Sequence, residues 1–260
     1  MKDGIRDIMK IKILRKKDPH LEFMIEGVTP AFVNALRRIM VSEVPTLAVE
    51  WADIEENNSV IFDEMLAHRL GMLPLVFDPK KLNFTENCKC DGKGCALCQA
   101  VLVLEKEGPC VVHSGDLKSS NREVKPTDPR FPLVELLKGQ SVKLSAVARL
   151  GTGRQHAKWQ AANASYQYYP ELKESKATGA PRCPRDCLKK VGSKVSFKDP
   201  TKCDLCGACA EAGVKIVGNP NKFIFRVESV SGLKPEYIVS KAVEILAGKA
   251  SELKSGLGKL

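Results

Sequence analysis

The sequence predicts an α+β fold in which the two ends of the chain form one domain and further domains are inserted between them. Two observations predict this arrangement. Each end of the chain carries a strand followed by an amphipathic helix, and both groups of cysteines lie in the middle. The composition of the 260 residues, 43% hydrophobic and 28% charged, is that of a globular protein and excludes a disordered or fibrous chain.

The N-terminal segment predicts a strand and then a helix. Leu21, Phe23 and Ile25 alternate with more polar residues, which is typical of a strand with one buried face. Thr29 and Pro30 are suited to the N-cap and first position of a helix. The helix then carries an apolar stripe at steps of three and four residues and ends before Pro45. The stripe consists of Phe32, Val33, Leu36, Ile39, Met40 and Val44.

The C-terminal segment repeats this order. Phe223, Phe225 and Val227 predict a strand, and Pro235 lies near the start of a second helix. The stripe of this helix is Ile238, Val239, Ala242, Val243, Ile245, Leu246, Ala250 and Leu253. The two end segments, 1–47 and 221–260, are small, so a partner with matching helices would complete their core. Periodicity alone equally allows both helices to pack on the chain's own sheet.

The middle of the chain predicts a mostly-β insert domain over 48–165 and a separate domain over 166–220. Asp63 is expected to cap a short helix that ends at Gly71, and Val142 to Leu150 is expected to form a strand. Near 170–185 the composition changes to Lys, Glu, Pro and Gly, which indicates a domain boundary.

The first group of cysteines predicts a zinc loop over 88–98. Its members are Cys88, Cys90, Cys95 and Cys98. The glycine-containing stretch between the two pairs can fold back so that four thiolates surround one ion, and such a site leaves no open position for catalysis. Free surface thiols or two disulfides are the alternatives, and they are less typical of clustered cysteines in a reducing compartment.

The second group predicts an iron–sulfur cluster. Three cysteines at two-residue intervals, Cys203, Cys206 and Cys209, follow a remote Cys-Pro pair at Cys183, as in ferredoxins with a single cluster. Cys187 is the alternative to Cys183 as fourth ligand. Spacing leaves open a 4Fe–4S or a 3Fe–4S cluster, and a second zinc site is the alternative. The remaining cysteine, Cys110, is expected to be a small core residue.

Other features exclude some classes of protein. No apolar run is long enough to span a bilayer and no signal-peptide-like stretch opens the sequence, so we expect a cytoplasmic protein without membrane contact. The net charge of +10 comes from basic residues that look scattered, so at most weak DNA contact is expected. His68 is interpreted as a hydrogen-bonded structural histidine, and His156 as part of a docking surface.

Three blocks of sequence resemble a known family of RNA polymerase subunits. The family includes the D-type subunits of archaeal RNA polymerase, the third-largest subunit of eukaryotic polymerase II and the bacterial alpha subunit. The first block is residues 34–40 (NALRRIM) with 44–46 (VPT). The second is 63–64 (DE) with 66–75 (LAHRLGMLPL), and the third is 151–159 (GTGRQHAKW). The zinc-loop spacing is similar to that of the eukaryotic relatives, and the ferredoxin-like insert to that of some archaeal relatives.

The resemblance implies a non-catalytic scaffold. It implies an alpha-subunit-like dimerisation domain that heterodimerises with subunit L, joined by the small subunits N and P and by the large catalytic subunits. The interface expected from the resemblance comprises Phe32, Val33, Leu36, Ile39, Met40, Ile238, Val239, Ala242, Val243 and Leu246. No Asp-x-x-Asp-x-Asp pattern for Mg²⁺ is present, so no catalytic residue is expected. An iron–sulfur electron-transfer or redox-sensing protein, and a zinc-dependent nucleic-acid binder, are the alternative hypotheses.

Overall fold

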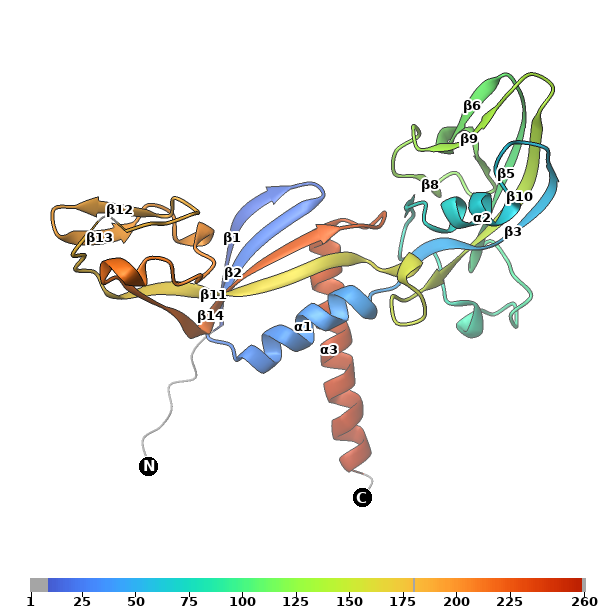
Figure 1. Ribbon diagram of the computed structural model, residues 1–260. Coiled ribbons are helices and arrows are strands. Elements are labelled where there is room, and N and C mark those ends of the chain that lie inside the picture. Colours follow the sequence, from blue (N-terminus) through green and yellow to red (C-terminus); the bar gives the residue numbers. More distant parts are fainter. Residues whose placement is uncertain (1–8, 180, 259–260) are drawn as a thin grey trace. The chain divides into compact units, whose positions relative to one another are not determined.

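The computed structural model describes residues 9–179 and 181–258 (Figure 1). These residues form an α+β fold that is mostly β, with three α-helices. The chain divides into two compact units, Met1–Arg37 with Ala164–Val227 and Arg38–Asn163 with Glu228–Leu260. Each unit therefore combines segments that are far apart in the sequence, and each is described by itself.

The first unit is built on a four-stranded sheet with the strand order β1-β2-β14-β11. The strands are β1 (Lys10–Lys17), β2 (His20–Glu26), β11 (Ala162–Glu174) and β14 (Lys215–Ser229). Leu21, Phe23 and Ile25 of β2 are buried, as their alternation predicts. Phe23 stacks on Phe225 of β14 with ring centroids 5.0 Å apart. The apolar contact thus joins strands from the two ends of the chain.

Helix α1 (Pro30–Ser42) follows β2 and begins as predicted. The Thr29 hydroxyl accepts a hydrogen bond from the backbone N–H of Phe32 at 3.4 Å, and Pro30 occupies the first helical position. Val33, Leu36, Ile39 and Met40 are buried, so the predicted stripe is the buried face of the helix.

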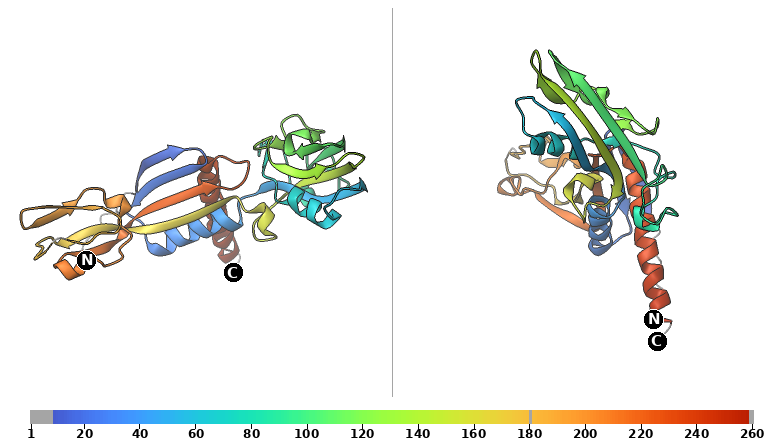
Figure 2. Two further views of the ribbon diagram at one scale, coloured as in Figure 1. Left: turned by 45° about the horizontal axis from the view of Figure 1, so that its top comes forward. Right: turned by 90° about the vertical axis from the view of Figure 1, so that its right-hand side faces the viewer.

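The segment between β11 and β14 in the first unit contains five of the cysteines. β11 and β14 extend beyond β1 and β2 and carry this segment at their end (Figures 1 and 2). It contains the hairpin β12 (Leu188–Val191) and β13 (Lys194–Phe197), with the short 3₁₀ turns η4 (Pro200–Lys202) and η5 (Ala210–Ala212). β11 and β14 run without interruption across the predicted boundaries near 165 and 220.

Arg226 of β14 connects the sheet to the cysteine-bearing segment. Its guanidinium donates hydrogen bonds to the Glu22 carboxylate of β2 at 3.1 Å and to the Gln167 side-chain oxygen of β11 at 2.7 Å. It also donates to the backbone carbonyl of Thr201 at 2.9 Å. A partly buried guanidinium whose donors are used in three directions holds the η4 turn of this segment against the sheet.

The second unit contains a second sheet with the strand order β3-β10-β5-β7. Its strands are β3 (Thr46–Asn57), β5 (Gln99–Glu107), β7 (Lys118–Ser119) and β10 (Ser141–Gly151), and β10 includes the predicted strand. Two small ladders join β4 (Leu75–Val76) to β8 (Lys125–Pro126) and β6 (Cys110–His113) to β9 (Pro132–Leu136). Short 3₁₀ turns are η1 (Thr85–Asn87), η2 (Ser114–Asp116) and η3 (Ala157–Trp159).

Helix α2 (Asp63–Gly71) ends at Gly71 as predicted, but its N-cap prediction is wrong. Phe62 occupies the N-cap position, and Asp63 is the first helical residue. The Asp63 carboxylate does not cap the helix because it has another partner. It accepts a hydrogen bond from the Asn57 side-chain amide at 2.7 Å. The negative charge of Asp63 still lies in the first turn, where it interacts favourably with the helix dipole.

Helix α3 (Pro235–Leu257) begins at Pro235 as predicted. Ile238 and Ala242 in its first half are buried, whereas every described residue from 247 onward is exposed. Lys249 forms an ion pair with Glu43. No helix among the described residues is long and apolar enough to cross a membrane.

Gly232 lies against the chain segment at Leu75, and this contact predicts a stability effect. A Cβ at Gly232 would overlap the Leu75 carbonyl group, so Gly232→Ala requires the backbone to move. We expect a loss of roughly 1–3 kcal/mol in the free energy of unfolding. Thermal unfolding measured by circular dichroism checks this.

Gly248→Ala is the matched control, because nothing lies within 4 Å of a Cβ at this exposed position inside α3. Alanine is there expected to be neutral or to stabilise the helix by up to about 1 kcal/mol. Equal unfolding temperatures of the two variants would contradict the predicted close approach at Gly232.

Candidate metal centres

The four cysteines of the predicted zinc loop converge in the second unit. Their sulfur atoms all lie within 4.8 Å of one another. The Cys88–Cys95 and Cys90–Cys98 sulfur pairs are 3.6 Å apart, and the Cys95–Cys98 pair is 3.9 Å apart. Four thiolates bound tetrahedrally at the usual Zn–S distance lie about 3.8 Å from one another. The spacing of the donors therefore fits one Zn²⁺ ion.

Tight turns bring the cysteines together. The backbone N–H of Asp91 donates to the Cys88 carbonyl at 3.2 Å, and those of Cys98 and Gln99 donate to the Cys95 carbonyl at 3.0 Å. The turn between the two pairs needs left-handed backbone at Gly92 and Gly94, with φ angles of 78° and 83°. Glycine adopts this conformation without steric cost, which explains the glycines in the loop.

Hydrogen bonding among the thiols separates their pKa values. Burial acts to raise the pKa of Cys90, but hydrogen bonds from Cys88 and Cys98 outweigh it and lower this pKa to about 7. At Cys88 a backbone hydrogen bond acts to lower the pKa, but burial and the bonds to the other thiols outweigh it and raise the pKa to about 12. Binding a metal through four thiolates must therefore displace protons, so metal affinity is expected to rise with pH.

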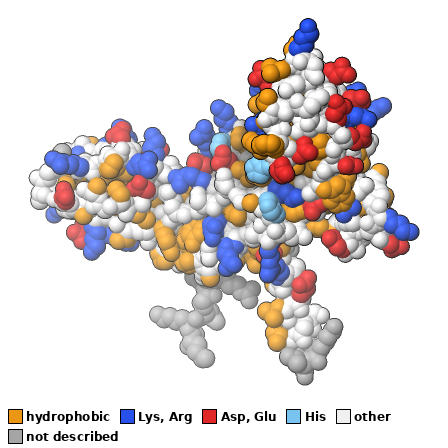
Figure 3. Space-filling view, turned by 45° about the vertical axis from the view of Figure 1, so that its right-hand side comes forward, with side chains coloured by type: hydrophobic (Ala, Val, Ile, Leu, Met, Phe, Trp, Pro, Cys, Tyr) orange, Lys and Arg blue, Asp and Glu red, His pale blue; other side chains and the backbone are white. Residues whose placement is uncertain are grey.

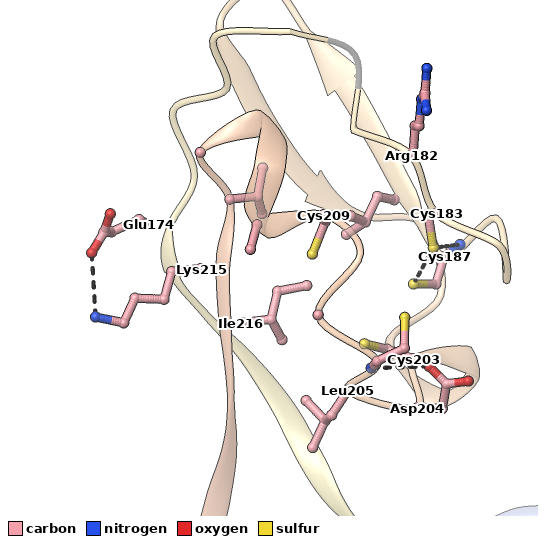
Figure 4. Close-up of a pocket in the computed structure, with 16 residues that line it drawn as sticks. Glu174, Arg182, Cys183, Cys187, Cys203, Asp204, Leu205, Cys209, Lys215 and Ile216 are labelled. Carbon is pink, nitrogen blue, oxygen red and sulfur yellow. Dashed lines mark hydrogen bonds and ion pairs between the residues drawn. The ribbon is translucent and has the colours of Figure 1, made fainter.

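The other five cysteines surround a cavity in the first unit. The cavity has a volume of about 290 Å³ and is lined by the sulfur-bearing side chains of Cys183, Cys187, Cys203, Cys206 and Cys209 (Figure 4). Apolar side chains, among them Leu205 and Ile216, also line it, together with the charged side chains Glu174, Arg182, Asp204 and Lys215. Thiolates around a largely apolar hollow are the donor set that iron–sulfur clusters use.

The arrangement of these five sulfurs differs from that of the zinc loop. Within 9–179 and 181–258, the four sulfurs of the zinc loop are the only group of three or more metal-ligating residues gathered within 4.8 Å. The sulfurs around the cavity do not form such a compact group of three or more, and donors placed around a hollow fit a cluster of several ions better than a single ion. Left-handed backbone at Leu205 and Gly207, with φ angles of 59° and 79°, turns the chain between the three closely spaced cysteines.

Cys183 and Cys187, the two candidates for the remote ligand, both line the cavity with their sulfur atoms 3.2 Å apart. Cys187 is 1% exposed and Cys183 is half-buried. Burial, reinforced by the Cys183 thiol, raises the pKa of Cys187. Although burial opposes it, hydrogen bonds from the backbone and thiol of Cys187 lower the pKa of Cys183. Cys183 is thus the more acidic thiol of the pair.

Three other residues of interest lie outside these sites. Cys110 is half-buried, and its thiol donates to the Glu107 carbonyl at 3.4 Å. The prediction for His68 is wrong, because it is exposed on α2 and its side chain makes no hydrogen bond within the described part of the chain. Its neighbour Arg69 instead ties α2 to the Leu133 carbonyl. His156 is exposed, and its Nδ1 atom accepts a hydrogen bond from the Lys158 backbone at 3.1 Å.

The predicted dimer-interface residues fall into two groups. Val33, Leu36, Ile39, Met40, Ile238 and Ala242 are buried within the chain itself. The remaining four reach the surface: Phe32, Val239 and Leu246 are half-buried, and Val243 is 45% exposed. The accessible apolar surface therefore lies mainly on α3. Sequence analysis missed Leu257, which is 61% exposed and extends this surface.

Comparison with known proteins identifies relatives of the chain. The family model described as the RNA polymerase Rpb3/Rpb11 dimerisation domain matches residues 22–250. A protein of Methanothermobacter thermautotrophicus named DNA-directed RNA polymerase subunit Rpo3 is 40% identical over 258 residues, which cover 94% of this chain and 97% of the relative. Proteins of the same name from Archaeoglobus fulgidus and Methanosarcina acetivorans are 39% and 36% identical, covering 94% and 97% of this chain and 96% and 99% of the relatives.

The geometry of the Cys88–Cys98 loop predicts one zinc ion per chain. Replacing Cys95 and Cys98 by serine removes two of the four thiolates, so the variant is expected to lose the ion and the protection of amides 83–99 from hydrogen exchange. Elemental analysis and hydrogen-exchange mass spectrometry measure the two effects. Cys110→Ser is the matched control and should retain both. Zinc content that is unchanged in the double variant would contradict this assignment.

Proposed function

The chain belongs to the RNA polymerase Rpb3/Rpb11 dimerisation family, and on this basis we propose that it pairs with subunit L to form the platform that receives the large catalytic subunits. It is a non-catalytic assembly subunit of DNA-directed RNA polymerase. The relatives match it over nearly its whole length, so the assignment concerns the entire chain.

The observation that carries this proposal is an exposed apolar seam on α3. The seam consists of Val239, Val243, Leu246, Ala250, Leu253 and Leu257. Successive members are separated by alternating steps of four and three residues, the spacing of residues that face a partner helix in a coiled coil. Leu253 is 66% exposed and Leu257 is 61% exposed. Apolar side chains are visible on the surface of α3 in Figure 3.

Such a seam favours another polypeptide as its occupant. A continuous apolar strip that a chain leaves exposed at this spacing is typical of an interaction surface. The family is named for dimerisation, so the expected occupant is a helix of the L-like partner. Ile238 and Ala242, which are buried in the first half of α3, then anchor the helix that carries this interface.

The finer organisation follows the family resemblance. We infer a discontinuous dimerisation domain of 1–47 and 221–260, an insert domain of 48–165 with the zinc loop, and a ferredoxin-like domain of 166–220. Subunits N and P are further expected partners, and the cytoplasm is the expected location.

Both metal groups are proposed as structural elements. The sulfur distances of Cys88, Cys90, Cys95 and Cys98 support zinc in the insert domain. The cavity shared by Cys203, Cys206, Cys209 and either Cys183 or Cys187 supports an iron–sulfur cluster, 4Fe–4S or 3Fe–4S. When bound, each group would cross-link a segment that has few apolar residues of its own. The comparisons give no support to the alternative of iron–sulfur electron transfer.

A charge placed in the seam tests the dimer. Val243→Asp is expected to weaken association with subunit L by about 2 kcal/mol or more, roughly 30-fold in Kd, because the interface would bury an unpaired carboxylate. The free chain should keep its unfolding temperature, since Val243 is 45% exposed. Calorimetric titration measures the affinity.

Val60→Asp is the control, because Val60 is 70% exposed and lies outside the seam. It should leave the affinity for subunit L unchanged. Equal affinities of the Val243→Asp variant and the unmodified chain would contradict a partner on this face of α3.

Removal of the cluster tests whether the two ends of the chain act separately from the cysteine-bearing segment. Cys203→Ser with Cys206→Ser is expected to abolish bound iron and to weaken recruitment of the large subunits. Dimer formation with subunit L should persist, because no seam residue lies in the segment that these cysteines hold. Iron content and co-purification with each partner measure the effects. A loss of the dimer as large as the loss of assembly would refute the separation.

A further inference from the structure

The basic residues are spread along the chain, but the excess of positive over negative charge is largest in one segment. Residues 176–202 contain eight Lys and Arg residues and two Asp residues, a net charge of +6 out of +10 for the whole chain. This segment includes the β12–β13 hairpin, and several Lys and Arg side chains stand out from it in Figure 3.

Three of these lysines share the solvent-facing side of the hairpin. In β12 and β13, Leu188 pairs with Phe197 and Lys190 with Val195, and the buried Leu188 and Val195 mark the side that faces the core. Lys189 and Lys194 therefore lie on the opposite side, because side chains alternate along a strand. Lys176 pairs directly with Lys194 in an isolated antiparallel bridge and so shares its side. We call Lys176, Lys189 and Lys194 the lysine face.

The charges of the lysine face are not compensated by the chain. Asp186 pairs with Lys198 at 2.6 Å, and the nearby Asp204 pairs with Arg185 at 3.1 Å, so these carboxylates serve other cations. Among the described residues, none of the three lysines takes part in an ion pair. Like charges directly opposite one another on neighbouring strands destabilise a sheet. The repulsion between Lys176 and Lys194 thus destabilises this part of the sheet, and a bound anion would reduce it.

We propose that the lysine face binds the phosphate backbone of duplex DNA without regard to sequence. Three exposed lysines on flexible stems suit a regular array of phosphates, which double-stranded DNA presents at one charge per about 1.7 Å of axis. A protein partner is less well suited. Protein interfaces usually depend on buried aromatic or arginine anchors, and the solvent side of this hairpin offers only Val191 beside lysine and serine.

Hydrogen bonds around the cysteine-lined cavity hold the segment that carries the lysine face in place. The backbone N–H groups of Lys198 and Asp199 both donate to the Cys187 carbonyl, at 2.8 and 3.3 Å, and so close the hairpin beside the cavity. Cys203 follows η4 directly, and the Gln167 side chain of β11 donates to its carbonyl at 3.0 Å. The three lysines are therefore presented by a segment anchored to the sheet, and not by a free loop. This contact goes beyond the assembly role, which requires no DNA.

Salt-dependent binding tests the proposal. The full-length chain is titrated into a fluorescein-labelled 30-base-pair duplex of random sequence, and anisotropy is recorded from 50 to 200 mM KCl. Replacing all three lysines by glutamine is expected to reduce the slope of log K against log [KCl] by about 2.7 and to weaken binding at 50 mM KCl roughly tenfold or more. A variant with three arginines in their place should keep the slope.

The matched control replaces Lys12, Lys138 and Lys234, which are equally exposed and lie outside residues 176–202, by glutamine. It has the same net charge as the test variant and should bind like the unmodified chain. An equal loss of binding in the control, or no binding of the unmodified chain at 50 mM KCl, would overturn the proposal. So would displacement of the DNA by polyglutamate of equal charge, which would indicate an acidic protein as ligand. Association with subunit L, measured in parallel, reports separately on the assembly role.

Discussion

The structure depends on the pairing of β2 with β14, which brings together strands from opposite ends of the sequence. The stacked rings of Phe23 and Phe225 make the same connection through side chains. Closing so long a loop costs entropy, but this cost grows only with the logarithm of length, so a buried apolar sheet face can offset it. Once these strands pair, all segments between them become insertions whose own stability decides whether they are ordered.

The insertions that cannot order themselves by apolar burial are the ones that carry cysteines. In the loop from Cys88 to Cys98 the only buried side chains are those of Cys88 and Cys98. The core of the other segment comprises Cys187, Leu188, Val195, Cys203, Cys209 and Val214, so half of it is cysteine. A metal group in each place would supply the cross-link that a larger segment obtains from its core. Arg226 performs a related task with hydrogen bonds, from the sheet to Thr201.

The sequence was informative wherever a local rule decides the structure. Thr29 and Pro30 start α1 and Pro235 starts α3, because caps and proline act within one turn. The spacing of Cys88 to Cys98 likewise foretold four converging sulfurs. Features set by distant partners were missed. The Asp63 carboxylate bonds to the Asn57 side chain and does not cap α2. The bridge between Lys176 and Lys194 forms only once the hairpin has formed. Such contacts depend on which distant residues the folded chain brings together, and a local sequence pattern does not contain that information.

The distal half of α3 shows why this subunit is incomplete by itself. Beyond Ala242 the helix retains exposed apolar side chains and contains Gly248 and Gly256, each of which costs helix stability. Its link to Glu43 through Lys249 is a single ion pair in which the lysine is half exposed to solvent, and such a pair contributes little. Neither propensity nor the chain's own packing thus explains a helix of 23 residues. Burial of the seam against a partner helix would supply the missing stabilisation, so the order of this segment and assembly are thermodynamically linked.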